Sequence, residues 1–147
     1  MKLESASHNA RPLTDQELAD LLEGPHIARL ATVRADGRPH IAPMWFLHRD
    51  EVFYFMQRKS AAKQKIANIQ ANPNVALSID TCGYPAEAVL VEGVAEMTEE
   101  QSDEIAGEIC VKYLGQERGQ ATFRTLRDES PMLLIRVRPN KLMHFHT

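Results

Sequence analysis

Short apolar runs separated by polar turns dominate the middle of the chain. Between Ile27 and Met56 there are three such runs, divided by Asp36-Gly37 and by Arg49-Asp50-Glu51. Glycine takes the positive φ that a tight hairpin requires, so the pattern predicts a three-strand meander. Apolar and polar residues alternate only partly within the runs, which is typical of strands covered on both faces.

Two prolines fall within the second of these runs. Pro39 and Pro43 each remove a backbone donor from the sheet ladder. The second strand is therefore expected to be interrupted or to lie at an edge of the sheet.

A basic segment follows the third run and is predicted to become a helix that ends at Asn72-Pro73. Ser60 is a candidate N-cap, and the free N–H groups of a first helical turn attract anions. A basic helix face is more often a solvated surface, but its position directly after an apolar strand favours a phosphate site. The cations of the segment are Arg58, Lys59, Lys63 and Lys65.

The flanking regions add helices and further strands. Thr14 and Glu17 form a capping-box signature before an amphipathic helix that ends at Gly24-Pro25 and is expected to plug one end of the barrel. A second capping box at Thr98 predicts a helix to Gly115, followed by a helical piece over 116–127. Strands are predicted over 75–80, over 86–97, where Gly93 indicates a bulge, and over 132–139.

The order and spacing of these motifs resemble a known family. LATVRADGRPHIAPMWF, FYF, the basic segment ending KIANIQANPNVALSID, and AVLVEGVAEM are similar to the pyridoxamine 5'-phosphate oxidase-like split-barrel superfamily of flavin and deazaflavin oxidoreductases. The resemblance covers residues 13–145. It implies a mainly β fold with peripheral helices, a six-stranded antiparallel split β-barrel of the FMN-binding type, and a homodimer with a cofactor in each of two interface clefts.

The resemblance also implies a set of cofactor-binding residues. Lys65, in the K-x7-P spacing with Pro73, matches the family's phosphate lysine, and Arg58 and Ser60 fall where the family's loop wraps that phosphate. Lys59 and Lys63 are the remaining cations of this predicted clamp. The strand expected to lie against the tricyclic ring consists of Ala42, Pro43, Met44 and Trp45.

One departure from the family pattern bears on the activity. Pyridoxamine 5'-phosphate oxidases carry an Arg and a Lys five residues apart on the second strand, whereas this chain has Ala42 and Leu47 in that register. We therefore expect an FMN- or deazaflavin-dependent oxidoreductase that is not a true pyridoxamine 5'-phosphate oxidase. The APMWF form looks more like the deazaflavin-using branch, but the choice between the two cofactors stays open. Hydride would pass between the cofactor and a small conjugated substrate.

Composition restricts the remaining possibilities. The 147 residues, 44% of them hydrophobic, suit one domain over 13–147 preceded by a mobile segment over 1–12. A net charge of −3 gives no global attraction to nucleic acid or membrane. No signal peptide and no apolar run near the ~20 residues of a membrane span is present, so a cytoplasmic location is expected.

Two alternatives to the enzyme belong to other classes. One is a non-catalytic split barrel that stores flavin or haem, with His40, His48 or the histidines of the C-terminal tail as haem ligands. The other is a structural dimer with an empty cleft.

Several single residues complete the candidates. His144 and His146 are spaced two apart, but no third metal ligand is evident and no metal is predicted. Cys82 and Cys110 lack metal-ligand or CxxC spacing and are expected to be reduced structural thiols. The resemblance makes Arg138 and Phe145 further site candidates, and Tyr84 is either a ring cover or an exposed loop residue.

Overall fold

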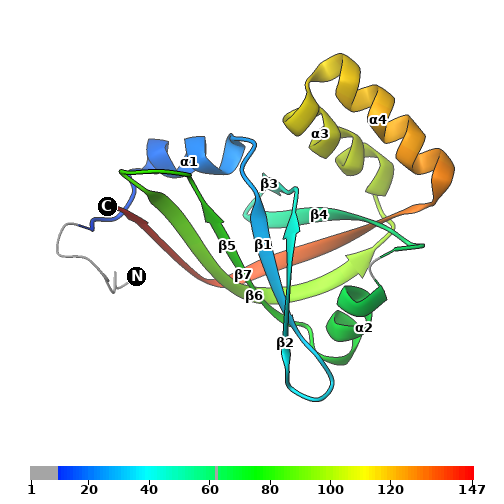
Figure 1. Cartoon of the computed structure of the whole chain (residues 1–147), viewed down its shortest axis with the longest axis horizontal. Helices are drawn as coiled ribbons and strands as arrows, with labels where there is room; N and C mark the ends of the chain where they lie inside the picture. The colour runs from blue at the N-terminus through cyan, green and yellow to red at the C-terminus, as the bar shows by residue number, and fades with distance from the viewer. Residues whose placement is uncertain (1–9, 62) are drawn as a thin grey trace.

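The strands of the protein form one seven-stranded antiparallel sheet in the order β2-β1-β5-β6-β7-β4-β3 (Figure 1). The computed structural model describes residues 10–61 and 63–147. The strands are β1 (Ala28–Val33), β2 (Pro39–Met44), β3 (Leu47–Arg49), β4 (Val52–Arg58), β5 (Asn74–Asp80), β6 (Glu87–Thr98) and β7 (Met132–His146). The helices are α1 (Asp15–Glu23), α2 (Lys63–Ala71), α3 (Ser102–Leu114) and α4 (Gln116–Glu129). The predicted mainly β class with peripheral helices is confirmed.

The seventh strand arises because the second apolar run is broken. Its first part, β2, pairs with β1, and its second part, β3, pairs with β4. The prediction of a continuous three-strand meander is therefore wrong, whereas the predicted interruption at an edge strand is confirmed. Only Trp45 and Phe46 separate β2 from β3, which are the two edges of the sheet.

This short connection forces the sheet to curl. Three peptide steps from Met44 to Leu47 span at most about 11 Å, so the two edges must approach each other there. The sheet is thus rolled upon itself without closing. Its inner face encloses the main core, to which Leu30, Phe55, Leu77, Val91 and Ile135 contribute.

Helices α1 and α2 add to this core. Leu21 and Leu22 of α1 and Ile69 of α2 belong to the same buried cluster as the inner side chains. The predicted capping box of α1 is confirmed: Thr14 Oγ1 accepts from the Glu17 N–H, and the Glu17 carboxylate accepts from the Thr14 N–H.

Helices α3 and α4 form a hairpin that connects β6 to β7 along the chain (Figure 1). Ile105 and Ile109 of α3 pack on Leu134 of β7, on the outer face of the sheet. The predicted capping box at Thr98 is wrong, because α3 begins at Ser102 and Gln101 occupies its N-cap position with a φ of 56°. The Thr98 hydroxyl instead accepts from the Glu100 N–H, which forms a local turn.

The C-terminal segment continues β7 along β6. The pairing shifts register between Glu92 and Gly93, so the predicted bulge is confirmed, and a Cβ on Gly93 would lie 2.6 Å from the Arg138 carbonyl oxygen. Arg11 pairs with His146 at the end of β7. The rest of the predicted mobile segment, residues 1–9, lies outside the described residues. In the described part of the chain, no helix has the length and apolarity needed to cross a membrane.

Candidate functional site

Helix α2 is held against β1 by a buried polar network. Gln64 Nε2 donates to Asn68 Oδ1 at 2.7 Å, and Asn68 Nδ2 donates to Thr32 Oγ1 at 2.9 Å. Asn68 and Thr32 are almost completely buried. Since buried polar groups that find partners fix orientation, this network determines which side chains of α2 face the sheet. Lys65 lies one helical turn before Asn68, on the same side of the helix.

Lys65 is the one lysine among the described residues that is classed as buried, with 8% of its surface exposed. Its Nζ lies 3.5 Å from Met44 Sδ on β2. Burial lowers the pKa of this ammonium. Within 10–61 and 63–147, no carboxylate forms an ion pair with it. An unpaired buried cation costs free energy that an anionic ligand would offset.

The other predicted cations take different positions. Arg58 pairs with Glu129 of α4 at 3.1 Å, and Lys59 pairs with Glu99 before α3. Lys63 is exposed at the first position of α2. The five-residue cluster predicted from sequence is thus only partly assembled: Lys65 faces Met44, whereas Arg58 and Lys59 are held by carboxylates.

Ser60 does not cap the helix. The helix begins at Lys63, three residues later, and Ser60 is exposed in a turn where its backbone N–H donates to Ser130 Oγ at 3.3 Å. The prediction of Ser60 as N-cap is wrong because the chain needs an additional turn to leave β4.

The strand predicted to contact the cofactor ring lies at an edge and ends at a sharp corner. Within β2, Ala42 is half-buried and Pro43 is exposed, while Met44 faces the core. Trp45 follows the strand and stacks on Tyr113 of α3, with ring centroids 4.7 Å apart and planes 4° from parallel. The predicted ring strand is therefore connected both to the buried Lys65 and to the α3–α4 hairpin.

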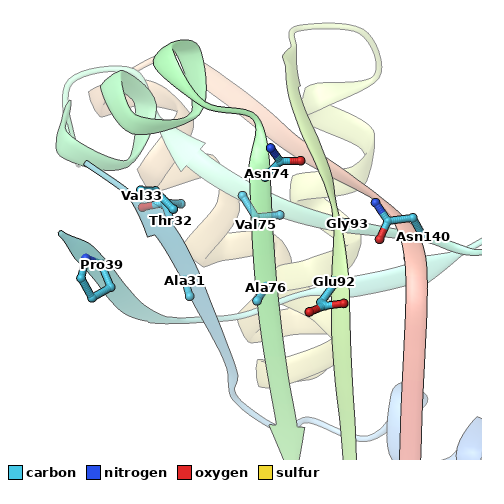
Figure 2. A pocket seen from close by; sticks show the side chains of 10 residues that line it. All are labelled: Ala31, Thr32, Val33, Pro39, Asn74, Val75, Ala76, Glu92, Gly93 and Asn140. Carbon is cyan, nitrogen blue, oxygen red and sulfur yellow. The ribbon is translucent and has the colours of Figure 1, made fainter. Parts of the chain in front are cut away.

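A hollow of about 410 Å³ lies across the sheet beside this strand (Figure 2). Its lining comes from five neighbouring strands and includes Pro39, Ala31, Ala76, Glu92 and Asn140. A hollow of this size falls within the range of small-molecule sites. Thr32 both lines it and accepts the hydrogen bond from Asn68, so α2 is linked directly to its wall.

The histidines do not gather at this hollow. His48 lies against Phe53 with ring centroids 4.6 Å apart, and its pKa is lowered by burial and by Lys112. His144 Nδ1 accepts from the Leu13 N–H at 2.9 Å. His40 pairs across the ladder with Thr32, and its Nδ1 is buried without a hydrogen-bond partner among the described residues.

His146 lies at the far end of β7 with two carboxylates. The ligand atoms of Glu17, Glu87 and His146 lie within 4.8 Å of one another. Glu17 is already occupied, because the Arg11 guanidinium binds both of its oxygens and holds its pKa at about 2. Its carboxylate also caps α1, so the arrangement supports the helix start.

The remaining candidates have simpler positions. Cys82 is exposed and Cys110 is buried, and both are free thiols. Tyr84 is exposed in the loop before β6. Arg138 pairs with Glu96 at 3.1 Å, and Phe145 is half-buried near the end of β7.

Sequence reasoning missed Thr32, Asn68, Lys112 and Tyr113. Asn68 could have been found from its spacing to Lys65, because residues three apart share a helix face. Thr32, Lys112 and Tyr113 belong to no recognisable motif, because their hydrogen-bond partners lie on elements distant in sequence.

A rolled, unclosed antiparallel sheet with helices at its periphery is the architecture of a split-barrel protein. A family model described as pyridoxamine 5'-phosphate oxidase matches residues 14–144, so the chain belongs to that family. The superfamily inferred from sequence motifs is confirmed. Comparison with curated proteins finds no significant match.

Solved structures show the same fold. An F420 reductase is 29% identical, with a TM-score of 0.65 over 84% of this chain and 93% of that chain. A conserved hypothetical protein from Mycobacterium tuberculosis is 20% identical, with a TM-score of 0.79 over 99% of this chain and 90% of that chain. The haem storage protein HutZ from Vibrio cholerae is 19% identical, with a TM-score of 0.70 over 89% and 94% of the two chains. At these identities the last two show the fold alone.

Proposed function

We propose that the protein is an FMN- or deazaflavin-dependent oxidoreductase that transfers a hydride between its cofactor and a small conjugated substrate. The observation that carries the proposal is Lys65, a buried ammonium facing the edge strand without a carboxylate partner in the described residues. Membership of the family and the likeness to an F420 reductase support the same reading.

The residues of the chain have separable tasks in this proposal. Lys65 would bind the cofactor phosphate through a charge-assisted hydrogen bond, and the Thr32–Asn68 bond holds α2 in the position that this requires. Backbone groups of Ala42 to Trp45 would meet the ring. A bound flavin or deazaflavin supplies the hydride chemistry itself, so the protein needs only to bind, orient and shield it.

The substrate is not pyridoxamine 5'-phosphate in this proposal. Ala42 and Leu47 occupy the positions where such oxidases carry a cation. In the structure Leu47 packs against the α3 cluster and offers no charge to a second phosphate.

We further propose that a second copy of the chain completes the site. The outer face of β2, β1, β5 and β6 exposes Ile41 (66%), Leu90 (37%) and Val94 (42%). Arg29, Glu92 and Lys141 lie on the same face, which therefore carries charges of both signs, as a two-fold, self-complementary contact requires. Within the chain, Arg29 pairs with Asp80 at 2.9 Å and Lys141 with Glu92 at 4.0 Å, so these pairs would have to be shared or exchanged across the contact. A stable interface of this kind needs about 800 Å² per partner.

The test is a titration of FMN, and separately of oxidised and reduced deazaflavin coenzyme, into wild-type protein and into two lysine variants. Lys65→Met removes the buried cation, whereas Lys63→Met removes an exposed cation two residues earlier on the same helix. We expect Lys65→Met to weaken cofactor binding by about tenfold or more, and Lys63→Met by much less. Absorbance and fluorescence of the cofactor report binding.

A thermal melt of the apo protein adds an independent readout. Replacing an unpaired buried ammonium by an apolar side chain of similar length should raise the apo melting temperature while binding is lost. If neither cofactor binds the wild-type protein at micromolar concentration, the proposed function is wrong. A Soret band on haem addition, without reduction of an electron acceptor by cofactor-loaded protein, would favour storage instead.

A further inference from the structure

The corner between β2 and β3 is held by two consecutive residues of α3. Phe46 lies outside both strands, so neither its N–H nor its C=O has a ladder partner. The Phe46 N–H donates to Tyr113 Oη at 3.1 Å, and Lys112 Nζ donates to the Phe46 carbonyl at 3.0 Å. Neighbouring side chains on one helix thus satisfy both backbone groups of one corner residue.

The same two side chains also hold the end of α1 and the entry to β1. Lys112 Nζ donates to the Leu22 carbonyl at 3.0 Å, and Tyr113 Oη donates to the His26 carbonyl at 2.6 Å. We call Lys112 and Tyr113 the corner clamp. It joins three segments that lie 66 to 90 residues away from it along the chain.

Aromatic contacts make the clamp rigid. The Tyr113 ring stacks on Trp45, and Lys112 Nζ lies 3.6 Å from the centre of the Phe46 ring. Burial raises the pKa of Tyr113 to about 12, so its hydroxyl stays protonated near neutral pH and can donate and accept together. Losing either clamp residue would leave partly buried backbone groups without partners.

We propose that Lys112 and Tyr113 are positioning residues for the cofactor ring, because they fix the corner that ends the ring strand. The inference rests on the proposed function. Met44 contacts Lys65, Trp45 stacks on Tyr113, and Phe46 is bonded by both clamp residues. Three consecutive residues therefore connect the phosphate lysine to the α3–α4 hairpin, and a displaced corner changes the ring's place relative to its phosphate.

The test compares Tyr113→Phe with Tyr54→Phe. Both substitutions remove one hydroxyl from tyrosines packed on the same α3 cluster, but in the described residues only that of Tyr113 has hydrogen-bond partners. Tyr113→Phe keeps the ring that stacks on Trp45. Its expected effects are about tenfold weaker binding of FMN or deazaflavin coenzyme and a shifted absorbance spectrum of the bound cofactor.

Trp45 is the single tryptophan of the chain, so its emission reports the corner directly. We expect Tyr113→Phe to change this emission and its quenching by cofactor, and Tyr54→Phe to change neither. Should Tyr113→Phe fail to fold, Lys112→Arg is compared with Tyr54→Phe in the same measurements. The planar, rigid guanidinium of arginine cannot reproduce the two hydrogen bonds that Lys112 Nζ donates to the Leu22 and Phe46 carbonyls.

The outcomes separate the two proposals. If wild-type protein binds cofactor and the two tyrosine variants have equal affinities and equal bound spectra, the positioning role is overturned and the proposed function stands. If wild-type protein binds neither cofactor, the proposed function fails and the positioning role fails with it.

Discussion

The outer face of the sheet has two halves that differ in what covers them. Over β3, β4 and the first part of β7, helix α3 buries Ile105, Ile109 and Leu134 together. Over β2, β1, β5 and β6 the same face carries no helix in the described residues, and Ile41 stands 66% exposed. On one half of the sheet, a helix of the same chain covers the apolar side chains. On the other half, they are exposed.

The difference lies in side-chain size as well as in coverage. The covered half presents large residues such as Tyr54 and Met56 to α3. The bare half has Ala31 and Ala76 at its centre, which leaves the hollow of Figure 2. Small residues cannot fill that space themselves, and contiguous exposed apolar surface commonly marks an interaction site.

The largest effect is expected from a charge placed in the covered half. Ile109→Asp would bury a carboxylate between α3 and the sheet, where Ile109 is completely buried. We expect a loss of about 4 kcal/mol or more in the free energy of unfolding, measured by urea denaturation at fixed protein concentration. A loss below about 1 kcal/mol would mean that α3 does not cover the sheet in solution.

The matched change in the bare half should act on association instead. Ile41→Asp should leave the unfolding free energy of the monomer within about 0.5 kcal/mol, because the side chain is exposed. In the proposed dimer it should raise the dissociation constant about 100-fold or more, since two copies of the residue are buried. Sedimentation equilibrium measures this constant. If the variant dimerises with the same dissociation constant as wild-type protein, the interface lies on another surface.

The hairpin that covers the sheet depends on a close helix crossing. A Cβ on Gly119 of α4 would lie 2.6 Å from Val111 Cα, whereas a Cβ on Gly107 of α3 would meet Phe123 at an ordinary 3.6 Å. Gly119→Ala should therefore cost about 2 kcal/mol in unfolding free energy, because backbone must move. Gly107→Ala is the control and should be neutral or stabilising by up to about 1 kcal/mol. Equal effects in the two variants would contradict the close crossing.

Sequence patterns correctly predicted the helices and strands that are determined by residues close together in the sequence. The Thr14 capping box places α1 correctly, and Pro39 and Pro43 correctly indicate an interrupted edge strand. The capping box predicted at Thr98 was wrong because a threonine hydroxyl can also stabilise a short turn, as that of Thr98 does here. The split of the second run at Trp45 could not be predicted without knowing that its two parts pair with different strands and form the two opposite edges of the sheet.

Of the candidate site residues, the sequence could indicate only those that belong to a family motif. Lys65 was singled out by its spacing to Pro73, and the structure shows that this side chain is buried. The clamp residues could not be found in this way, because their partners are backbone groups of Leu22, His26 and Phe46. Backbone partners leave no side-chain pattern in the sequence, and they appear only once the fold is known.

The smallest expected effect is a change in the pH dependence of stability caused by Lys112 on the covering helix. Burial lowers its pKa from 10.5 to about 8. Between these values the unfolded chain holds a proton that the folded chain has released, so stability should rise with pH, at most by about 1.4 kcal/mol per pH unit.

Tyr113 acts in the opposite direction at higher pH. Its pKa is raised from 10.0 to about 12, so it reduces stability as pH rises above the unfolded value. Cys110, whose pKa burial raises, and Lys65, whose pKa burial lowers, also affect stability between pH 8 and pH 10, so Lys112 is isolated by comparison with a variant that lacks it. Urea denaturation of wild-type protein and of Lys112→Met, compared at each pH, should show a difference that grows by about 1 kcal/mol in favour of wild type, allowing for solvent screening. A constant difference would mean that the ammonium reaches water, and that α3 covers this end of the sheet less tightly than its contacts with Leu22 and Phe46 imply.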